Sequence, residues 1–304
     1  MNKIVLCGIQ EQGKDIIKFL YQHGIEVTHI VTIREETAIK NRSESTWVSY
    51  EDISVEYNIP IYYAKSYSLT HEEDVNYFTK NDFFILLLGG WQRLIKKQIL
   101  KTITYPIGQH GSSEHLPEYR GRSPLNWSII RGKKRLIWNL FLLDEDIDNG
   151  DVVDYCQFEI NEFDDCNSMY YKVGVSVKHM LTRTIPKLIN GDFQKLKQIG
   201  EPSYYEKRTP EDGKINFDDS VYDICNLIRG VTKPYPGSFV KYGKDRIIIW
   251  QAKLWDTTLP FYRTKKYGEI VEIFDNDFVV KCKDGLLLVT NHEDVSIFIG
   301  KRYV

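Results

Sequence analysis

The sequence has few cysteines and no long run of apolar residues. Its cysteines are odd in number, lie far apart and form no Cys-x-x-Cys pair, which favours reduced thiols; they are Cys7, Cys156, Cys166, Cys225 and Cys282. The longest apolar run, residues 83–88, is too short to cross a membrane, and the apolar run after Met1 is too short for a signal peptide. We therefore expect a cytoplasmic protein without a membrane partner.

The sequence also has no large excess of positive or of negative charge. The 304 residues carry 40 Lys+Arg against 42 Asp+Glu, and residues 201–304 carry 16 of each. Proteins that hold nucleic acid by its phosphates usually show a basic excess in the chain or in one domain. A nucleic-acid partner is therefore disfavoured. The apolar fraction of 42% and the charged fraction of 27% are typical of a globular protein, and the length allows two domains.

No group of His, Cys and carboxylate residues has the spacing of a metal site. The acidic stretch at residues 144–151 is similar to a calcium loop at first sight. Its glycine, however, is the seventh residue and not the sixth, and its twelfth residue is Tyr155 and not glutamate. We therefore predict no metal ion.

Short apolar segments alternate with helical patterns over the first 200 residues. Gly8 and Gly13, after the first segment, could belong to a phosphate-binding turn, but a tight strand-to-helix turn is the preferred interpretation. Alternating strands and helices predict a doubly wound parallel sheet. The strand candidates are residues 4–7, 27–33, 59–64, 83–88, 135–143 and 151–160, and helices are expected to end near Gly24, to contain Leu94, Ile95 and Ile99, and to cover residues 125–130 and 167–190.

Beyond a polar stretch at residues 191–213, which we expect to be an interdomain linker, the pattern changes to β. Ser220 is expected to cap a helix that ends at Gly230. Five short strands should follow, at residues 238–242, 246–254, 268–274, 278–282 and 286–290. The predicted architecture is therefore α/β, with a Rossmann-like parallel-sheet catalytic domain over residues 1–200 and a β-rich, OB-like small-barrel domain over residues 205–304.

The stretch from residue 110 to residue 151 carries the clearest chemical signal. His110 lies between Gly108 and Gly111 in a Gly/Ser-rich segment, which we expect to be a loop. A Leu-Pro-Glu-Tyr-Arg-Gly turn follows it, and Asp148-Asn-Gly150 comes later. An imidazole, a carboxylate that can orient it and exposed backbone amides suit proton transfer during attack on a carbonyl group. A lone histidine is more often structural. His110 is a candidate catalytic residue because glycines, serines and Asp148 accompany it in this stretch.

Two regions of the chain resemble the folate-dependent formyltransferases, the family of methionyl-tRNA formyltransferase and the sugar-nucleotide N-formyltransferases. The family pattern runs Asn-x-His-Pro-Ser-Leu-Leu-Pro-x-Tyr-Arg-Gly and later Asp-x-Gly, and residues 110–151 are similar to it. The segments that begin at Arg208 (Arg-Thr-Pro-Glu-Asp-Gly) and at Arg229 (ending Pro-Tyr-Pro-Gly-Ser-Phe) resemble those of formyltransferases that act on 4-amino sugars of nucleoside diphosphates. The resemblance spans nearly the whole chain.

The resemblance implies an enzyme that moves a formyl group from 10-formyltetrahydrofolate to the primary amine of a nucleotide-linked amino sugar. His110 would stabilise the tetrahedral intermediate and shuttle protons, and Asp148 would orient the imidazole. The family's folate site maps to two segments, represented by Gly89, Gly90, Trp91 and Leu94 and by Leu143, Asp144, Asp146 and Ile147. The residues expected to bind the acceptor are Arg120, Arg122, Arg208, Arg229 and Tyr235.

The family's asparagine is missing, which leaves alternatives open. If His110 is the family histidine, Gly108 stands at the asparagine position; an alignment without a gap would put Ser112 at the histidine. We prefer His110, because serine is no base at neutral pH, with Gln109 or Gly111 as the oxyanion donor and His115 as the alternative imidazole. The alternative functions are a methionyl-tRNA formyltransferase and a non-catalytic folate- or nucleotide-sugar-binding protein. The oligomeric state is open, with a homodimer as the candidate assembly.

Overall fold

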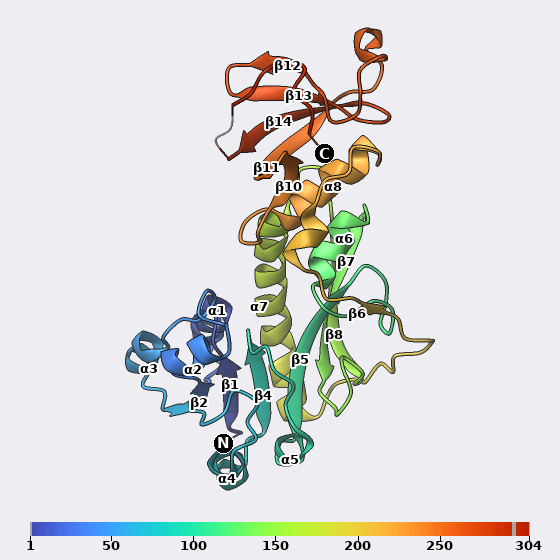
Figure 1. Cartoon of the computed structure of the whole chain (residues 1–304). Helices are drawn as coiled ribbons and strands as arrows, with labels where there is room; N and C mark the ends of the chain where they lie inside the picture. The colour runs from blue at the N-terminus through green and yellow to red at the C-terminus, as the bar shows by residue number, and fades with distance from the viewer. Residues whose placement is uncertain (1, 294–295, 304) are drawn as a thin grey trace. The chain divides into compact units, whose positions relative to one another are not determined.

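The computed structural model describes residues 2–293 and 296–303, which form two compact units (Figure 1). The first unit comprises residues 1–121, 137–157 and 173–203, and the second comprises residues 122–136, 158–172 and 204–304. Three elements have residues in both units: β7 (Arg135–Leu142), β8 (Val152–Glu159) and α7 (Cys166–Asn190). This grouping puts residues 122–136 and 158–172 with the C-terminal residues, and the domain boundary between residues 200 and 205 stays a prediction.

The first unit is built on a seven-stranded sheet in the order β3-β2-β1-β4-β5-β7-β8. The strands β1 to β5 pair in parallel with their neighbours, and β5 and β7 pair antiparallel. The Rossmann-like parallel sheet is therefore confirmed. Its remaining elements are β1 (Ile4–Gly8), α1 (Glu11–Gln22), β2 (His29–Thr32), α2 (Glu35–Lys40), α3 (Glu51–Tyr57), β3 (Ile61–Tyr63), α4 (Glu72–Asn81), β4 (Ile85–Gly89), α5 (Lys97–Leu100), β5 (Tyr105–Ser112) and β6 (Arg120–Gly121).

Glycines let β1, α1 and β4 approach one another closely. A Cβ on Gly13 would lie 2.1 Å from the Tyr50 hydroxyl and 2.9 Å from the Gly89 carbonyl oxygen, and one on Gly8 would meet the same two atoms. The Tyr50 hydroxyl is buried and donates to the Gln10 carbonyl at 2.7 Å. Packing against Tyr50 thus accounts for both glycines, in agreement with a tight strand-to-helix turn.

Two sequence-based expectations for this unit are wrong. The Gly/Ser-rich segment around His110 is not a loop but the strand β5, because β4 and β7 on either side supply partners for its backbone. A Cβ on Gly108 would lie 2.5 Å from Leu143 Cδ2, so a side chain at this position would displace Leu143. The helix expected to include Leu94 covers only α5, and Leu94 is 57% exposed.

The second unit combines helices with a five-stranded antiparallel sheet in the order β10-β11-β14-β13-β12. The helix α8 (Val221–Val231) packs against α6 (Pro124–Ile130) and β11, and Ser220 caps it by accepting from the Tyr222 N–H, as predicted. The five predicted strands are confirmed. The other elements are β9 (Tyr204–Tyr205), a 3-10 turn (Pro210–Gly213), β10 (Ser238–Tyr242), β11 (Asp245–Asp256), a 3-10 turn (Pro260–Tyr262), β12 (Ile270–Phe274), β13 (Asp277–Lys281) and β14 (Leu286–His292).

None of the described helices is both long enough and apolar enough to cross a membrane.

Candidate active site

His110 lies on β5, an interior strand of the seven-stranded sheet, and is buried, with 6% of its surface exposed. Its Nδ1 is 3.4 Å from Asp148 Oδ2, and its Nε2 is 3.2 Å from the Tyr119 carbonyl oxygen. Both neighbours are hydrogen-bond acceptors. The neutral ring can donate to only one of them, whereas the protonated ring can donate to both. This arrangement suits a histidine that takes up a proton in the course of a reaction.

Asp148 is held in the turn between β7 and β8. Its φ of 52° lies in the left-handed region, and its Oδ2 accepts the Gly121 N–H at 3.1 Å. Two residues further on, a Cβ on Gly150 would lie 1.5 Å from the Leu142 carbonyl oxygen, so only glycine fits. The Asp-x-Gly spacing therefore has a steric reason as well as a chemical one.

The turn at residues 116–121, which provides the partners of His110 and Asp148, is itself tied to a distant segment. Ser203 accepts the Tyr119 N–H with its Oγ at 2.9 Å and the Arg120 N–H with its carbonyl oxygen at 2.9 Å. The Arg120 guanidinium is buried and donates to Gln198 Oε1 through Nε at 3.0 Å and Nη2 at 2.7 Å. The Arg120 guanidinium thus donates to another residue of the chain.

The other candidates near His110 lie in different surroundings. Gln109 precedes His110 on the strand, so its side chain points to the opposite face of the sheet; its Nε2 donates to the Leu88 carbonyl at 2.8 Å and its Oε1 accepts Trp138 Nε1 at 3.0 Å. Ser112 Oγ donates to the Glu118 carbonyl at 2.8 Å. His115 is exposed and packs edge-on against Tyr155. Of the imidazoles considered, His110 is the one beside Asp148.

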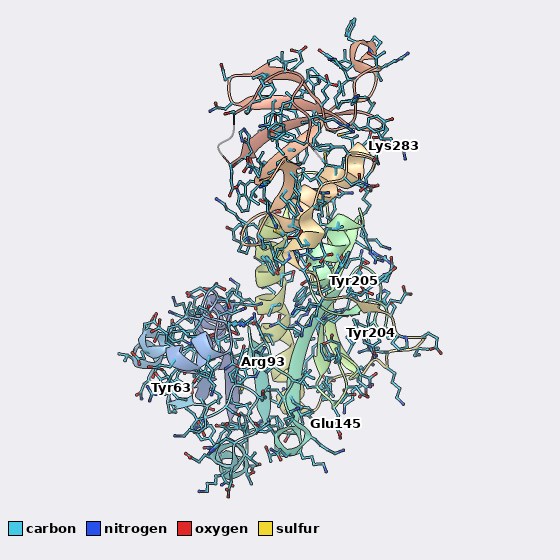
Figure 2. The ribbon with its side chains drawn as sticks, viewed as in Figure 1. Tyr63, Arg93, Glu145, Tyr204, Tyr205 and Lys283 are labelled. Atoms are coloured by element: carbon cyan, nitrogen blue, oxygen red, sulfur yellow. The ribbon has the colours of Figure 1, made fainter. Side chains whose placement is uncertain are left out.

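The two segments predicted to bind folate belong to the same unit. Lys97, three residues after Leu94, forms an ion pair with Glu145 of the second segment, which is labelled in Figure 2. In the first segment, Gly90 has a φ of 81° and the Trp91 indole is buried, with no hydrogen-bond partner for Nε1 among the described residues. In the second, Asp144 accepts the Asp146 N–H at 3.0 Å and so shapes the turn. Leu94 and Ile147 are exposed, and Leu143 is half-buried.

In the second unit, Arg208 and Tyr235 line a pocket of about 130 Å³ together with Ser123, Thr209, Pro210, Gly213, Val231, Pro236 and Gly237. The Arg208 guanidinium lies 5.8 Å from the Trp127 ring centre and 5.7 Å from that of Tyr235. Its Nε is buried without a hydrogen-bond partner among the residues that the structure describes. Burial lowers the pKa of Arg208, opposed by Tyr235 and Asp212. The pocket therefore offers an unmet donor and an aromatic face.

Two further predicted acceptor residues are arranged differently. Arg229 donates through Nη1 to the carbonyl oxygens of Asn161 (2.7 Å) and Asp164 (2.8 Å), and through Nε and Nη2 to Asn226 Oδ1. Its guanidinium thus joins segments of its own unit. Arg122 is exposed just before α6.

Sequence reasoning missed Gln198, Ser203 and Asn139. Asn139 faces His110 across the β5–β7 pair and donates to the His110 carbonyl at 3.2 Å. Gln198 and Ser203 lie in the segment interpreted as a linker, and no motif marks them. Within residues 2–293 and 296–303, no group of three His, Cys, Asp or Glu residues is arranged to hold a metal ion.

The fold and site define a two-unit α/β protein in which a buried histidine on a Rossmann-like sheet pairs with a half-buried aspartate. The family model for formyl transferase matches residues 1–185, and the model for the formyl transferase C-terminal domain matches residues 207–295. The chain therefore belongs to the formyl transferase family.

Several known proteins are similar to this chain. The bifunctional polymyxin resistance protein ArnA of Wigglesworthia glossinidia brevipalpis is 29% identical over 99% of the chain, which spans only 46% of that protein. Methionyl-tRNA formyltransferase of Caldanaerobacter subterraneus subsp. tengcongensis is 26% identical over 94% of the chain and 90% of its own length. The crystal structure of an N-formyltransferase from Helicobacter canadensis, in complex with folinic acid and dTDP-3-aminofucose, has a TM-score of 0.68, 18% identity, and coverage of 96% of this chain and 100% of its own. At that identity the likeness concerns the fold.

Proposed function

We propose that this protein is an N-formyltransferase that moves a formyl group from 10-formyltetrahydrofolate to the amine of a nucleotide-linked amino sugar. The observation that carries the proposal is the His110–Asp148 pair in a formyl transferase fold: His110 is buried on β5, and its Nδ1 lies 3.4 Å from Oδ2 of Asp148 in the turn between β7 and β8. Formyl transfer requires a base for the amine proton and a cation near the carbonyl oxygen, and a His–Asp pair supplies both in turn.

In this proposal His110 and Asp148 act as one unit. Formyl-folate, when bound, supplies the activated formyl group. The amine gives up a proton as the new C–N bond forms, and Asp148 helps His110 to receive it. The protonated imidazole, with the Tyr119 carbonyl and Asp148 as its acceptors, stabilises negative charge on the former carbonyl oxygen. His110 then returns the proton to the nitrogen that leaves, so the pair ends as it began.

The residues of the predicted folate site fit a flat, partly polar ligand. Leu94 and Ile147 are exposed, and Trp91 has a buried Nε1–H without a hydrogen-bond partner in the described part of the chain. Exposed apolar side chains and an unmet donor are what a heterocycle with ring nitrogens would cover and satisfy. The solved Helicobacter canadensis relative, which shares the fold, was crystallised with folinic acid. We propose that these residues, with Gly89, Gly90, Leu143, Asp144 and Asp146, hold the donor.

For the acceptor we propose the Arg208 pocket. A phosphate would satisfy the buried Arg208 Nε, and the Tyr235 ring lines the same pocket. The guanidinium groups of Arg120 and Arg229 already bind the chain's own oxygen atoms, so we give these arginines a structural role. The neutral balance of residues 201–304 favours a small nucleotide sugar over tRNA.

The test is formyl transfer in solution. Purified protein is incubated with 10-formyltetrahydrofolate and, separately, with UDP-, dTDP- and GDP-linked amino sugars or with methionyl-tRNA, and formylated product is measured by mass spectrometry. We expect product with at least one nucleotide sugar, and stabilisation against heat by the matching nucleoside diphosphate. Transfer to tRNA alone would assign the methionyl-tRNA reaction. Binding of ligands without any transfer would indicate a non-catalytic binding protein.

A further inference from the structure

The segment at residues 196–203 forms hydrogen bonds to both turns of the site: the turn at residues 116–121 and the turn that contains Asp148. Gln198 is the residue that joins them most directly. Its Oε1 accepts two hydrogen bonds from Arg120, and its Nε2 donates to the carbonyl oxygens of Asp148 and Gly150, each at 2.8 Å. All four of these residues belong to the first unit. The Gln198 amide is therefore bonded at both ends.

We propose that Gln198 is a positioning residue, which sets the direction of the Asp148 carboxylate towards His110. This inference rests on the proposed function of the His110–Asp148 pair. Asp148 has a left-handed backbone, and the backbone of Gly150 is packed closely against Leu142, so the turn is tight. The only side chain found to bond both carbonyl oxygens of this turn, among the described residues, is Gln198.

The same glutamine also couples the two halves of the motif. Arg120 follows Tyr119, whose carbonyl accepts from His110, and precedes Gly121, whose N–H donates to Asp148. Arg120 is buried and donates two hydrogen bonds to Gln198, which in turn donates to the Asp148 turn. A shift of that turn must therefore move Arg120 or break its hydrogen bonds. Ser203 fixes the other side of the Tyr119–Arg120 turn. Residues 196–203 thus form a brace for the catalytic pair, and not a simple linker.

Three glutamine variants separate the parts of this brace. Gln198→Glu keeps an acceptor for Arg120 but loses both N–H donors to the turn, and Gln198→Leu loses both ends. Gln194→Leu is the matched control, since Gln194 is an exposed glutamine just before this segment. A misplacement of about 1 Å at a catalytic group can cost on the order of 100-fold, so we expect kcat to fall about 10- to 100-fold in both Gln198 variants. We expect each KM to change less than about threefold and Gln194→Leu to match wild type, because binding groups are untouched.

A double-mutant cycle shows whether Gln198 acts through Asp148. In an Asp148→Asn background, Gln198→Leu should change kcat by less than about twofold, because the group that it positions no longer works. Full additivity of the two changes would overturn the proposal, and so would single variants with the kcat of Gln194→Leu.

Hydrogen exchange gives a readout that needs no turnover. Amides of residues 146–151 should exchange faster in Gln198→Leu than in Gln194→Leu, while the amides of β1 and β4 exchange alike in both. Equal exchange over residues 146–151 would overturn the brace. Absence of formyl transfer in the wild type, with faster exchange in Gln198→Leu, would instead contradict the proposed function and leave the brace standing.

Discussion

The His110–Asp148 pair and the Arg208 pocket differ in whether their polar groups have hydrogen-bond partners within the chain. Around the pair, backbone and side-chain groups are bonded within the chain: Tyr119 accepts from His110, Gly121 donates to Asp148, and Gln198 bonds the Asp148 turn. In the pocket, Arg208 has a buried Nε with no partner among the described residues. Groups that must hold one geometry are fixed before a ligand arrives, whereas a group that must bind an anion pays a desolvation cost until the anion is present.

The largest effect should come from breaking the catalytic pair. We expect His110→Asn and Asp148→Asn each to lower kcat by about 10²- to 10⁴-fold, the usual contribution of general acid–base catalysis, measured as initial rates of formyl transfer. The double variant should lose little more than either single variant, because the two residues act together. His115→Asn is the control, since this imidazole is exposed. A near-normal His110→Asn enzyme together with an inactive His115→Asn enzyme would show that His115, and not His110, is the catalytic imidazole.

The next effect concerns the pocket. Arg208→Lys keeps a charge but loses the fork, so the KM for the nucleotide sugar should rise about 10- to 100-fold, as expected when a charged hydrogen bond worth about 1.5–3 kcal/mol is lost. The KM for the folate should stay the same, since Arg208 is not among the proposed folate residues. Arg131→Lys is matched, because Arg131 also lies over the Trp127 ring but outside the pocket. An equal rise in both variants would contradict the assignment.

The contrast also explains what the sequence could and could not predict. The parallel sheet and the α8 cap follow from local apolar runs and from Ser220, whose effects act over a few residues. The strand β5 was missed because its Gly/Ser-rich residues have low strand propensity and depend on β4 and β7 for pairing. Gln198 was missed for a related reason: its partners, Arg120 and Asp148, are distant in sequence.

A smaller effect should follow when the missing asparagine is restored. A Cβ at position 108 would lie 2.5 Å from Leu143 Cδ2 and 2.9 Å from Phe141 Cζ, so Gly108→Asn must displace Leu143, a proposed folate residue. We expect kcat to gain nothing, the KM for folate to rise several-fold, and the free energy of unfolding to fall by about 1–3 kcal/mol, the usual cost of overpacking. Gly108→Ala adds the Cβ without the amide and should behave alike in thermal unfolding and kinetics. A higher kcat in Gly108→Asn alone would show that the amide is useful there.

The smallest effect should come from Arg122, whose side chain is exposed in front of α6. If it contributes only long-range attraction to a diphosphate, Arg122→Gln should raise the KM for the nucleotide sugar by about threefold at most, because exposed charges interact weakly in water. The effect should disappear near 1 M salt, where the screening length is about 3 Å. The Arg208→Lys effect should persist at the same salt concentration, since a buried group is screened much less. The measurement is the KM for the nucleotide sugar in both variants over a range of salt concentrations. An Arg122→Gln effect that is large and independent of salt would place Arg122 in direct contact with the substrate.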